Sequence, residues 1–226
     1  MNEIKLLTFE DYFAKVKELE GGHWTLDTIK LRWTYHYRVV ELIKALQLKD
    51  ASKVLEMGTM GVQCVKNGHT IDYAERWNFP GKQPDYLHDA RKLPWPIEDK
   101  KYDLFIALRV YQHLVPVQKE CVQEAMRIAK KVIIITPNYY DNNVLPDSRG
   151  ITYTNFVEFL NGIHPNLYIP TELGDLYYWD TEQPSALNIE QVVSPTIKYP
   201  KNDTSESSFK DSFSRKIKRK IKRLLK

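Results

Sequence analysis

The stretch Val54-Leu55-Glu56-Met57-Gly58-Thr59-Met60-Gly61 decides the fold class of this chain. A short apolar run ends beside an acidic residue, and two glycines follow it. Glycine lets the backbone turn tightly with a positive φ and lets a ligand approach the backbone amides. A carboxylate beside such a turn can hold an amino group or a ribose hydroxyl. Alone, however, a short Gly-x-x-Gly is often only a strand-to-helix turn.

The segments that follow alternate between strand and helix patterns. Near-continuous apolar strands separated by helices indicate a mostly parallel sheet with helices on both faces. The sequence therefore predicts an α/β, Rossmann-like fold. The predicted strands are Lys53–Met57, His69–Tyr73, Asp103–Leu108 and Lys131–Thr136, and the predicted helix is Gln118–Ala129.

The flanking regions predict two helices before the sheet and a less regular region after it. Residues 8–20 begin with a helix cap, and a longer helix runs from Leu26 to Leu46. After the last parallel strand we expect a helix at Phe156–Asn161 and a closing antiparallel pair, Asp175–Asp180 with Ile189–Val193. The expected organisation is a helical cap over residues 1–50, the main domain over 51–200, a polar linker at 201–208 and a basic tail at 209–226.

Length and composition are those of one globular domain. The chain has 226 residues, of which 42% are hydrophobic and 27% charged. It contains no apolar run of the roughly 18 residues that a membrane span needs, and its N-terminus has no signal core, so we expect a cytoplasmic protein. Cys64 and Cys121 belong to no CxxC or CxxxH cluster, and we expect neither a disulfide framework nor a metal site.

Further short motifs follow the glycine turn in a fixed order. Asp72 ends the second predicted strand, where a carboxylate can accept hydrogen bonds from both ribose hydroxyls. Next come Asp89-Ala90, then the strand that ends at Leu108, and then Tyr111-Gln112-His113-Leu114. A basic helix end and the strand Lys131–Thr136 close the series.

As an ordered set, these motifs resemble those of small class I S-adenosylmethionine-dependent methyltransferases, especially those of polysaccharide and sugar biosynthesis. The likeness covers about 85 residues, from Lys53 to Asn138. It implies that S-adenosylmethionine is the cofactor and that certain positions contact it. By position, Glu56, Gly58 and Gly61 would face its methionine part, with Thr59 between the glycines, and Asp72 would hold its ribose. Asp89 and Ala90 would meet the adenine, and Leu108 and Arg109 would lie beside the sulfonium.

The sequence departs from the family pattern in three places. Only ten residues separate Gly61 from Asp72, so the helix between the first two strands must be very short. Met60 stands where a small residue is common, and Tyr111-Gln112-His113-Leu114 replaces Leu-Glu-His-Leu.

Methyl transfer to an oxygen with a high pKa needs a proton acceptor. His113 follows the strand Asp103–Leu108 on the side where substrate should lie, and it is the first candidate for this general base. His36 and Tyr35, on the long N-terminal helix, are further candidates. The aromatic residues of that region, Trp24, Trp33, Tyr35 and Tyr37, can form core or stack on a sugar ring.

The last 18 residues differ from the body in charge. Phe209–Lys226 holds nine Lys or Arg and one acidic residue, a net charge of +8, which leaves −4 for the other 208 residues of a chain whose total is +4. On a helix, its apolar residues form one stripe with the basic residues around it: Phe209, Phe213, Ile217, Ile221, Leu224 and Leu225. This composition is typical of a helix lying in an anionic membrane surface, although a disordered tail or a nucleic-acid arm is also compatible with the charge.

The apolar stripe gives the membrane interpretation a direct test. Changing Ile217, Ile221 and Leu224 to Ser, with every Lys and Arg kept, should abolish binding to anionic vesicles as fully as deletion of residues 209–226 does, because membrane insertion needs apolar contact as well as charge. Vesicle co-sedimentation measures this. Undiminished vesicle binding by the Ser variant would exclude the membrane helix. A nucleic-acid arm would instead bind nucleic acid through charge alone, with an affinity that falls steeply with salt.

These observations predict a cytoplasmic S-adenosylmethionine-dependent methyltransferase, peripheral at the inner membrane face, that O-methylates a sugar or lipid-linked glycan. Two alternatives remain open at this stage: a nucleic-acid methyltransferase that uses the basic tail, and a non-catalytic module that keeps the methyltransferase fold.

Overall fold

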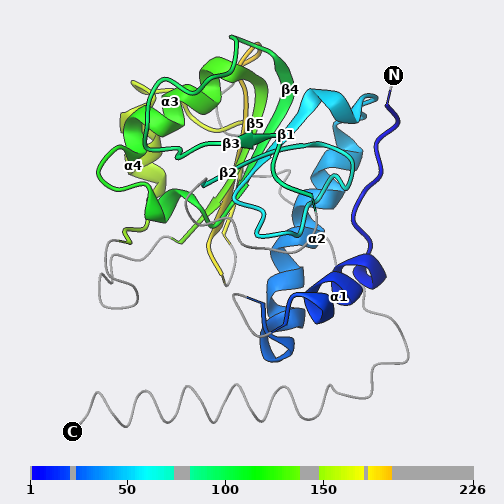
Figure 1. Ribbon diagram of the computed structural model, residues 1–226. Helices are drawn as coiled ribbons and strands as arrows, with labels where there is room; N and C mark the ends of the chain where they lie inside the picture. Colours follow the sequence, from blue (N-terminus) through cyan, green and yellow to red (C-terminus); the bar gives the residue numbers. More distant parts are fainter. Residues whose placement is uncertain (1, 21–23, 74–81, 138–147, 171–172, 185–226) are drawn as a thin grey trace, which may run out of the picture.

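The computed structural model describes residues 2–20, 24–73, 82–137, 148–170 and 173–184 (Figure 1). It contains one seven-stranded sheet in the order β3-β2-β1-β4-β5-β7-β6. The first five strands in this order are parallel to one another, and β7 is antiparallel to both of its neighbours. The predicted Rossmann-like fold with a C-terminal antiparallel pair is confirmed.

The strands lie close to their predicted positions along the central sheet. Their bounds are β1 Val54–Met57, β2 His69–Asp72, β3 Tyr86–Leu87, β4 Tyr102–Leu108, β5 Ala129–Thr136, β6 Leu167–Ile169 and β7 Asp175–Asp180. Every residue of β1 is buried, as expected of a strand covered on both faces. The C-terminal pair consists of β7 with β6, and β5 takes the other edge of β7. Ile189–Val193, the partner expected for β7, lies outside the described residues.

Helices cover both faces of the sheet (Figure 1). On one face, α1 Phe9–Glu18 and α2 Ile29–Ala45 pack in one apolar cluster with side chains such as Val54, Ile106 and Ile133. On the other face, α3 Gln118–Ile128 and α4 Tyr153–Phe159 pack against side chains such as Leu55 and Phe105. The described residues also form short 3-10 turns at η1 Leu26–Thr28, η2 Ala51–Lys53 and η4 Tyr111–His113. Among the described helices, none has the length and apolarity needed to cross a membrane.

Two local expectations are corrected by the structure. No helix forms in the described residues between Gly58 and Gly68, where a very short one was expected. The only bridge there joins Val65 to Leu6. The second correction concerns α4, which begins at Tyr153 rather than Phe156, because Thr152 and Asn155 form a reciprocal cap at its start.

Candidate functional site

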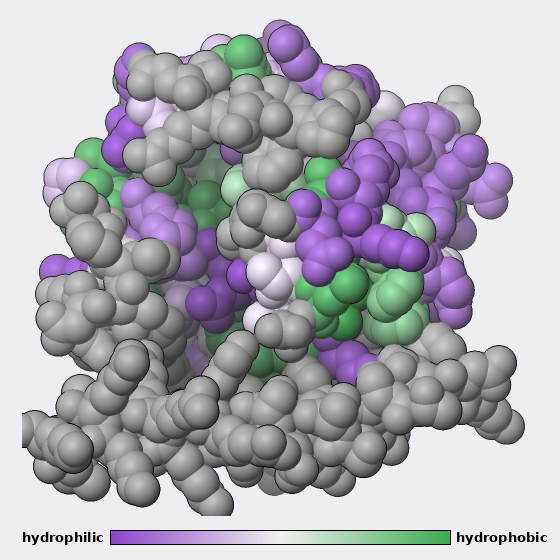
Figure 2. Space-filling model, turned by 60° about the horizontal axis from the view of Figure 1, so that its bottom comes forward, coloured by the Kyte–Doolittle hydropathy of each residue, from purple (hydrophilic) through white to green (hydrophobic). Residues whose placement is uncertain are grey.

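The parallel strands β1, β2 and β4 end together at one edge of the sheet, the usual place for a ligand in this class of fold. Figure 2 looks onto this end of the molecule and shows a recess with hydrophilic residues next to hydrophobic ones. Two adjoining cavities open here, of about 270 Å³ and about 490 Å³. They share the lining residues Met57, Gly58, Asp72, Tyr73, Val110 and His113.

The glycine turn forms one wall of both cavities. Gly58 has a φ of +65°, and its amide donates to the carbonyl of Ile71 at 3.0 Å. A Cβ at this position would lie 2.5 Å from a methyl group of Val110. Gly61 also has a positive φ, +86°, and Met60 between them has +50°. The turn therefore needs glycine both for its conformation and for its close approach to the residues after β4.

Glu56 orders the loop that follows this turn. Its carboxylate accepts hydrogen bonds from the amides of Cys64 at 2.9 Å and Val65 at 2.6 Å, and the residue is only 2% exposed. Burial raises the pKa of Glu56 to about 7, against the opposite effect of the two amides. Glu56 also lines the larger cavity. The resemblance assigned it to the methionine part of the cofactor, and the structure adds that it holds a loop without helical hydrogen bonds in place.

Asp72 lies where the two cavities join, and one oxygen of its carboxylate accepts no hydrogen bond from the described residues. Its Oδ1 accepts from the amide of Tyr73 at 2.8 Å. Its Oδ2 is buried and has no hydrogen-bond partner in the described part of the chain. Burial raises the pKa of this carboxyl group. Buried polar atoms are nearly always hydrogen-bonded, so this oxygen suits a ligand with hydroxyl donors, such as a ribose.

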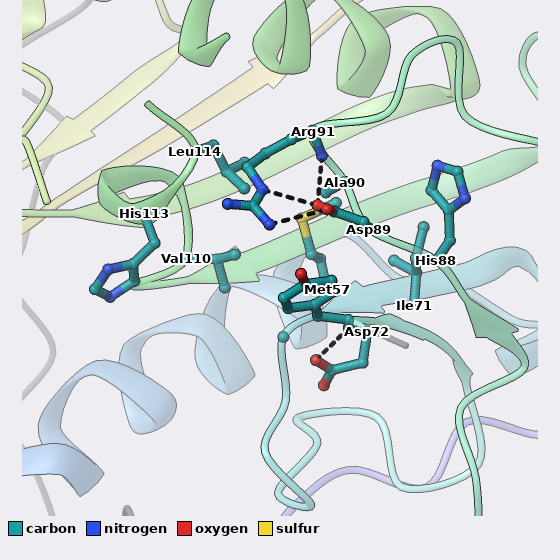
Figure 3. Close-up of a pocket in the computed structure, with 12 residues that line it drawn as sticks. Met57, Ile71, Asp72, His88, Asp89, Ala90, Arg91, Val110, His113 and Leu114 are labelled. Atoms are coloured by element: carbon teal, nitrogen blue, oxygen red, sulfur yellow. Dashed lines mark hydrogen bonds and ion pairs between the residues drawn. The ribbon is translucent and has the colours of Figure 1, made fainter. Parts of the chain in front are cut away.

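The smaller cavity is bounded by the segment after β3. The Asp89 carboxylate accepts from the amide, Nε and Nη2 of Arg91 at 2.9–3.0 Å, and this pairing holds the pKa of Asp89 below its usual value. Figure 3 shows the Arg91 guanidinium reaching over to Asp89, with Ala90 beside them. The guanidinium also lies 5.1 Å from the centre of the Tyr73 ring. Asp89 and Ala90 thus line the cavity as expected of an adenine subsite.

Leu108 and Arg109, at the end of β4, line the larger cavity only. Leu108 is partly buried, and Arg109 has a φ of +60°. On the opposite wall of that cavity, α2 places Arg32, Tyr35 and His36. Trp24 reaches the glycine turn from the same side, because its Nε1 donates to the carbonyl of Met60 at 2.7 Å. The N-terminal helices therefore complete the site.

His36 is a buried, neutral imidazole. It is 2% exposed and stacks on Tyr35 with ring centres 4.5 Å apart. Its Nδ1 lies 3.0 Å from the carbonyl of Arg32, which can only accept, so Nδ1 carries the proton. Burial lowers the pKa of His36 to about 4. This side chain can orient an acceptor, but protonating it is unfavourable.

The low pKa of His36 predicts a pH-dependent stability. The unfolded chain takes up a proton at this residue near pH 6.5 and the folded chain only near pH 4, so protonation favours unfolding between these values. In His36→Asn, which keeps a donor to the Arg32 carbonyl, this effect is absent. From pH 7 to pH 4, wild type should lose about 3 kcal/mol of unfolding free energy relative to the variant.

Urea unfolding of both proteins at several pH values measures this difference, and the titration of Glu56 cancels because both proteins contain it. Parallel stability curves for the two proteins would show that His36 is not held neutral.

His113 ends η4 at the mouth of both cavities. It is exposed, and its Nε2 lies 3.2 Å from the Gln112 amide nitrogen, which in turn donates to the carbonyl of Arg109 at 2.6 Å. An amide N–H only donates, so Nε2 is the acceptor nitrogen of the ring. The lone pair of Nε2 is therefore engaged by the Gln112 side chain, and His113 can take up a proton at Nε2 only when that hydrogen bond is released.

The structure brings the twelve predicted site residues to one edge of the sheet, although their roles remain predictions. Gly61 and Thr59 lie in the glycine loop, and Thr59 lines the larger cavity. Sequence reasoning offered Trp24 only as core or as a surface for a sugar ring, and it gave no role to several other lining residues: Arg32, Tyr73, Arg91, Val110 and Gln112. In the described residues, no three His, Cys, Asp or Glu side chains gather as a metal ion would require.

The similarity of this chain to known proteins lies among solved structures. No protein-family model and no curated protein matches the sequence. Among solved structures, a SAM-dependent methyltransferase from Thermotoga maritima is similar with a TM-score of 0.48 at 11% identity, over 72% of this chain and 96% of that chain. Another, from Aquifex aeolicus, has a TM-score of 0.43 at 15% identity, over 73% of this chain and 96% of that chain.

The strand order and the reversed β7 decide the fold. This chain has the class I methyltransferase fold. In doubly wound folds, ligands bind where the parallel strands end, and the two cavities lie at the ends of β1, β2 and β4.

Proposed function

We propose that this protein binds S-adenosylmethionine and transfers its methyl group to an acceptor held in the larger cavity. The observation that carries the proposal is Asp72, whose buried Oδ2 has no partner in the described residues and stands where the two cavities join. A ribose placed there would put the adenine in the smaller cavity, beside Asp89 and Ala90, and the methionine part in the larger one.

When bound, the cofactor supplies a methyl group on a positively charged sulfur, which an acceptor oxygen attacks in line. The chain's own part is to bring the two groups together and to exclude water. Gly58 lets the backbone approach the ligand closely, and Trp24 closes the wall above the glycine turn. Leu108 provides an apolar contact in the same cavity.

The proton of an acceptor hydroxyl has to leave as the new bond forms. We assign its removal to His113, because this exposed imidazole lines both cavities and can return the proton to water. His36 is buried, and its neutral ring takes up a second proton only near pH 4. It is therefore better suited to accept a hydrogen bond from the hydroxyl that receives the methyl group. Tyr35 is also buried, and burial raises its pKa, so its hydroxyl stays protonated and acts as a donor.

For the acceptor class, we propose a hydroxyl of a sugar or lipid-linked glycan. Trp24 and Tyr35 line the larger cavity, whereas Trp33 lines neither. Arg32 lies over the Trp24 ring and His36 stacks on Tyr35, so the support for a sugar comes from the ring edges that border the cavity. The basic tail supports a site of action at an anionic membrane surface.

Transfer of a labelled methyl group tests the proposal. Wild type and Asp72→Asn are incubated with S-adenosylmethionine carrying a labelled methyl, together with a panel of sugars, sugar phosphates, lipid-linked glycans and nucleic acids. Label should enter at least one acceptor with wild type and far less with Asp72→Asn. Cofactor binding without transfer to any acceptor class, nucleic acid included, would instead identify a non-catalytic binding module.

A further inference from the structure

Arg109 has a backbone conformation that residues with a side chain rarely adopt. Its φ is +60°, in the left-handed region. The conformation is fixed from two sides, because its amide donates to the carbonyl of Ile135 at 2.7 Å and its carbonyl accepts from the Gln112 amide at 2.6 Å. Such strain persists where the surrounding structure imposes it, and it is concentrated at functional sites.

The guanidinium of Arg109 has spare hydrogen-bonding capacity at the cavity. Its Nη1 donates to the carbonyl of Leu173, and no described carboxylate forms an ion pair with it. By contrast, Arg91 is paired with Asp89, and Arg127 with Glu124 and Asp99. A guanidinium has five N–H donors, so a single carbonyl leaves most of them for a ligand.

A second arginine in the same cavity lies on its other side. Arg32 stands 5.2 Å from the centre of the Trp24 ring, and Trp24 is hydrogen-bonded to Met60 in the glycine turn. Both guanidiniums lower the pKa of Tyr35 against the larger effect of burial, and all three residues line the same cavity. Arg32 is therefore linked through Trp24 to the glycine turn, whereas the Arg109 guanidinium donates to Leu173.

We propose that the acceptor carries an anionic group, a phosphate or a carboxylate, and that Arg109 binds it. The proposal rests on the proposed function, because it identifies the larger cavity as the acceptor site. The larger cavity is lined by two arginines and two carboxylates, Glu56 and Asp72. Glu56 is held by two loop amides and Asp72 is assigned to the ribose, which leaves Arg109 as the charged group for the acceptor. The planar guanidinium matches the oxygens of a phosphate or a carboxylate and forms charge-assisted hydrogen bonds with them.

Inorganic phosphate and acetate are minimal probes for this site, and they separate the two anion classes. Each is titrated into wild type and Arg109→Gln at constant ionic strength, with and without saturating S-adenosylhomocysteine, and binding is followed by NMR. We expect at least one of the anions to bind wild type at least about tenfold more tightly than the variant, the minimum cost of losing a charged hydrogen-bond partner. The affinity for S-adenosylhomocysteine should fall by much less than the anion affinity, because Arg109 adjoins the cofactor but its guanidinium is assigned to the acceptor.

Two further variants complete the test. Lys119→Gln removes the same charge from an exposed position on α3 outside both cavities, and it should leave anion binding unchanged. Arg109→Lys keeps the charge without the planar fork, so it should show intermediate affinity, and it serves as the test variant should Arg109→Gln not fold.

Three results would overturn the inference. The first is that neither anion binds wild type, and the second is that Lys119→Gln loses as much anion affinity as Arg109→Gln. The third is a loss of S-adenosylhomocysteine affinity in Arg109→Gln that matches its loss of anion affinity. The last would assign Arg109 to the cofactor carboxylate. If anions bind through Arg109 while S-adenosylhomocysteine does not bind at all, the anion site stands and the proposed function fails.

Discussion

Replacing His113 with alanine is expected to lower turnover by about 10²- to 10⁴-fold, the usual contribution of a general base. The affinity for S-adenosylhomocysteine should change little, because His113 is exposed at the mouth of the cavities rather than buried behind the ligand. Turnover is measured as the steady-state rate of labelled methyl transfer to an acceptor identified by the labelled-transfer experiment. Calorimetry measures the affinity for S-adenosylhomocysteine.

A matched control is available in His164, which is bonded to the Tyr153 hydroxyl at 2.7 Å and lines neither cavity. His164→Ala should leave the rate unchanged. An unaltered rate in His113→Ala would instead move the base to His36 or Tyr35, or show that the attacking oxygen is already ionised.

Replacing Asp72 with asparagine is expected to weaken S-adenosylhomocysteine binding by about 10- to 100-fold, equivalent to about 1–3 kcal/mol. The amide keeps the shape of the side chain but presents one NH₂ group where the carboxylate offers only acceptors to hydroxyl donors. Isothermal titration calorimetry measures the change.

Asp103→Asn is the control for this substitution. Asp103 is paired with Lys130 at 3.1 Å at the start of β4 and lines neither cavity, so its loss should leave affinity unchanged. Equal affinities for wild type and Asp72→Asn would show that Asp72 does not contact the ligand.

The central sheet could be predicted because its strands are short apolar runs with clear ends. Asp72 is the last residue of β2, and Gly58 directly follows β1, so their meeting at one edge of the sheet follows from parallel pairing alone. The two strands that the sequence missed are β3, of two residues, and β6, of three. Segments this short have no measurable alternation of side chains.

The missed part of the site depends on packing between segments that are far apart in the sequence. Arg32 and Trp24 reach the cavity only because α2 packs across the sheet next to the glycine turn. Val110 is identified as a wall residue only by its contact with Gly58. After Gly61 the buried Glu56 carboxylate binds the amides of Cys64 and Val65, which therefore cannot take part in the interior of a helix.

Titration of S-adenosylhomocysteine into the full-length protein, followed by calorimetry, tests the central claim most directly. We predict one binding site per chain, with an affinity that falls in Asp72→Asn and persists in Asp103→Asn. A protein that is folded, as judged by cooperative unfolding, and that releases no binding heat with either S-adenosylhomocysteine or S-adenosylmethionine would contradict the account.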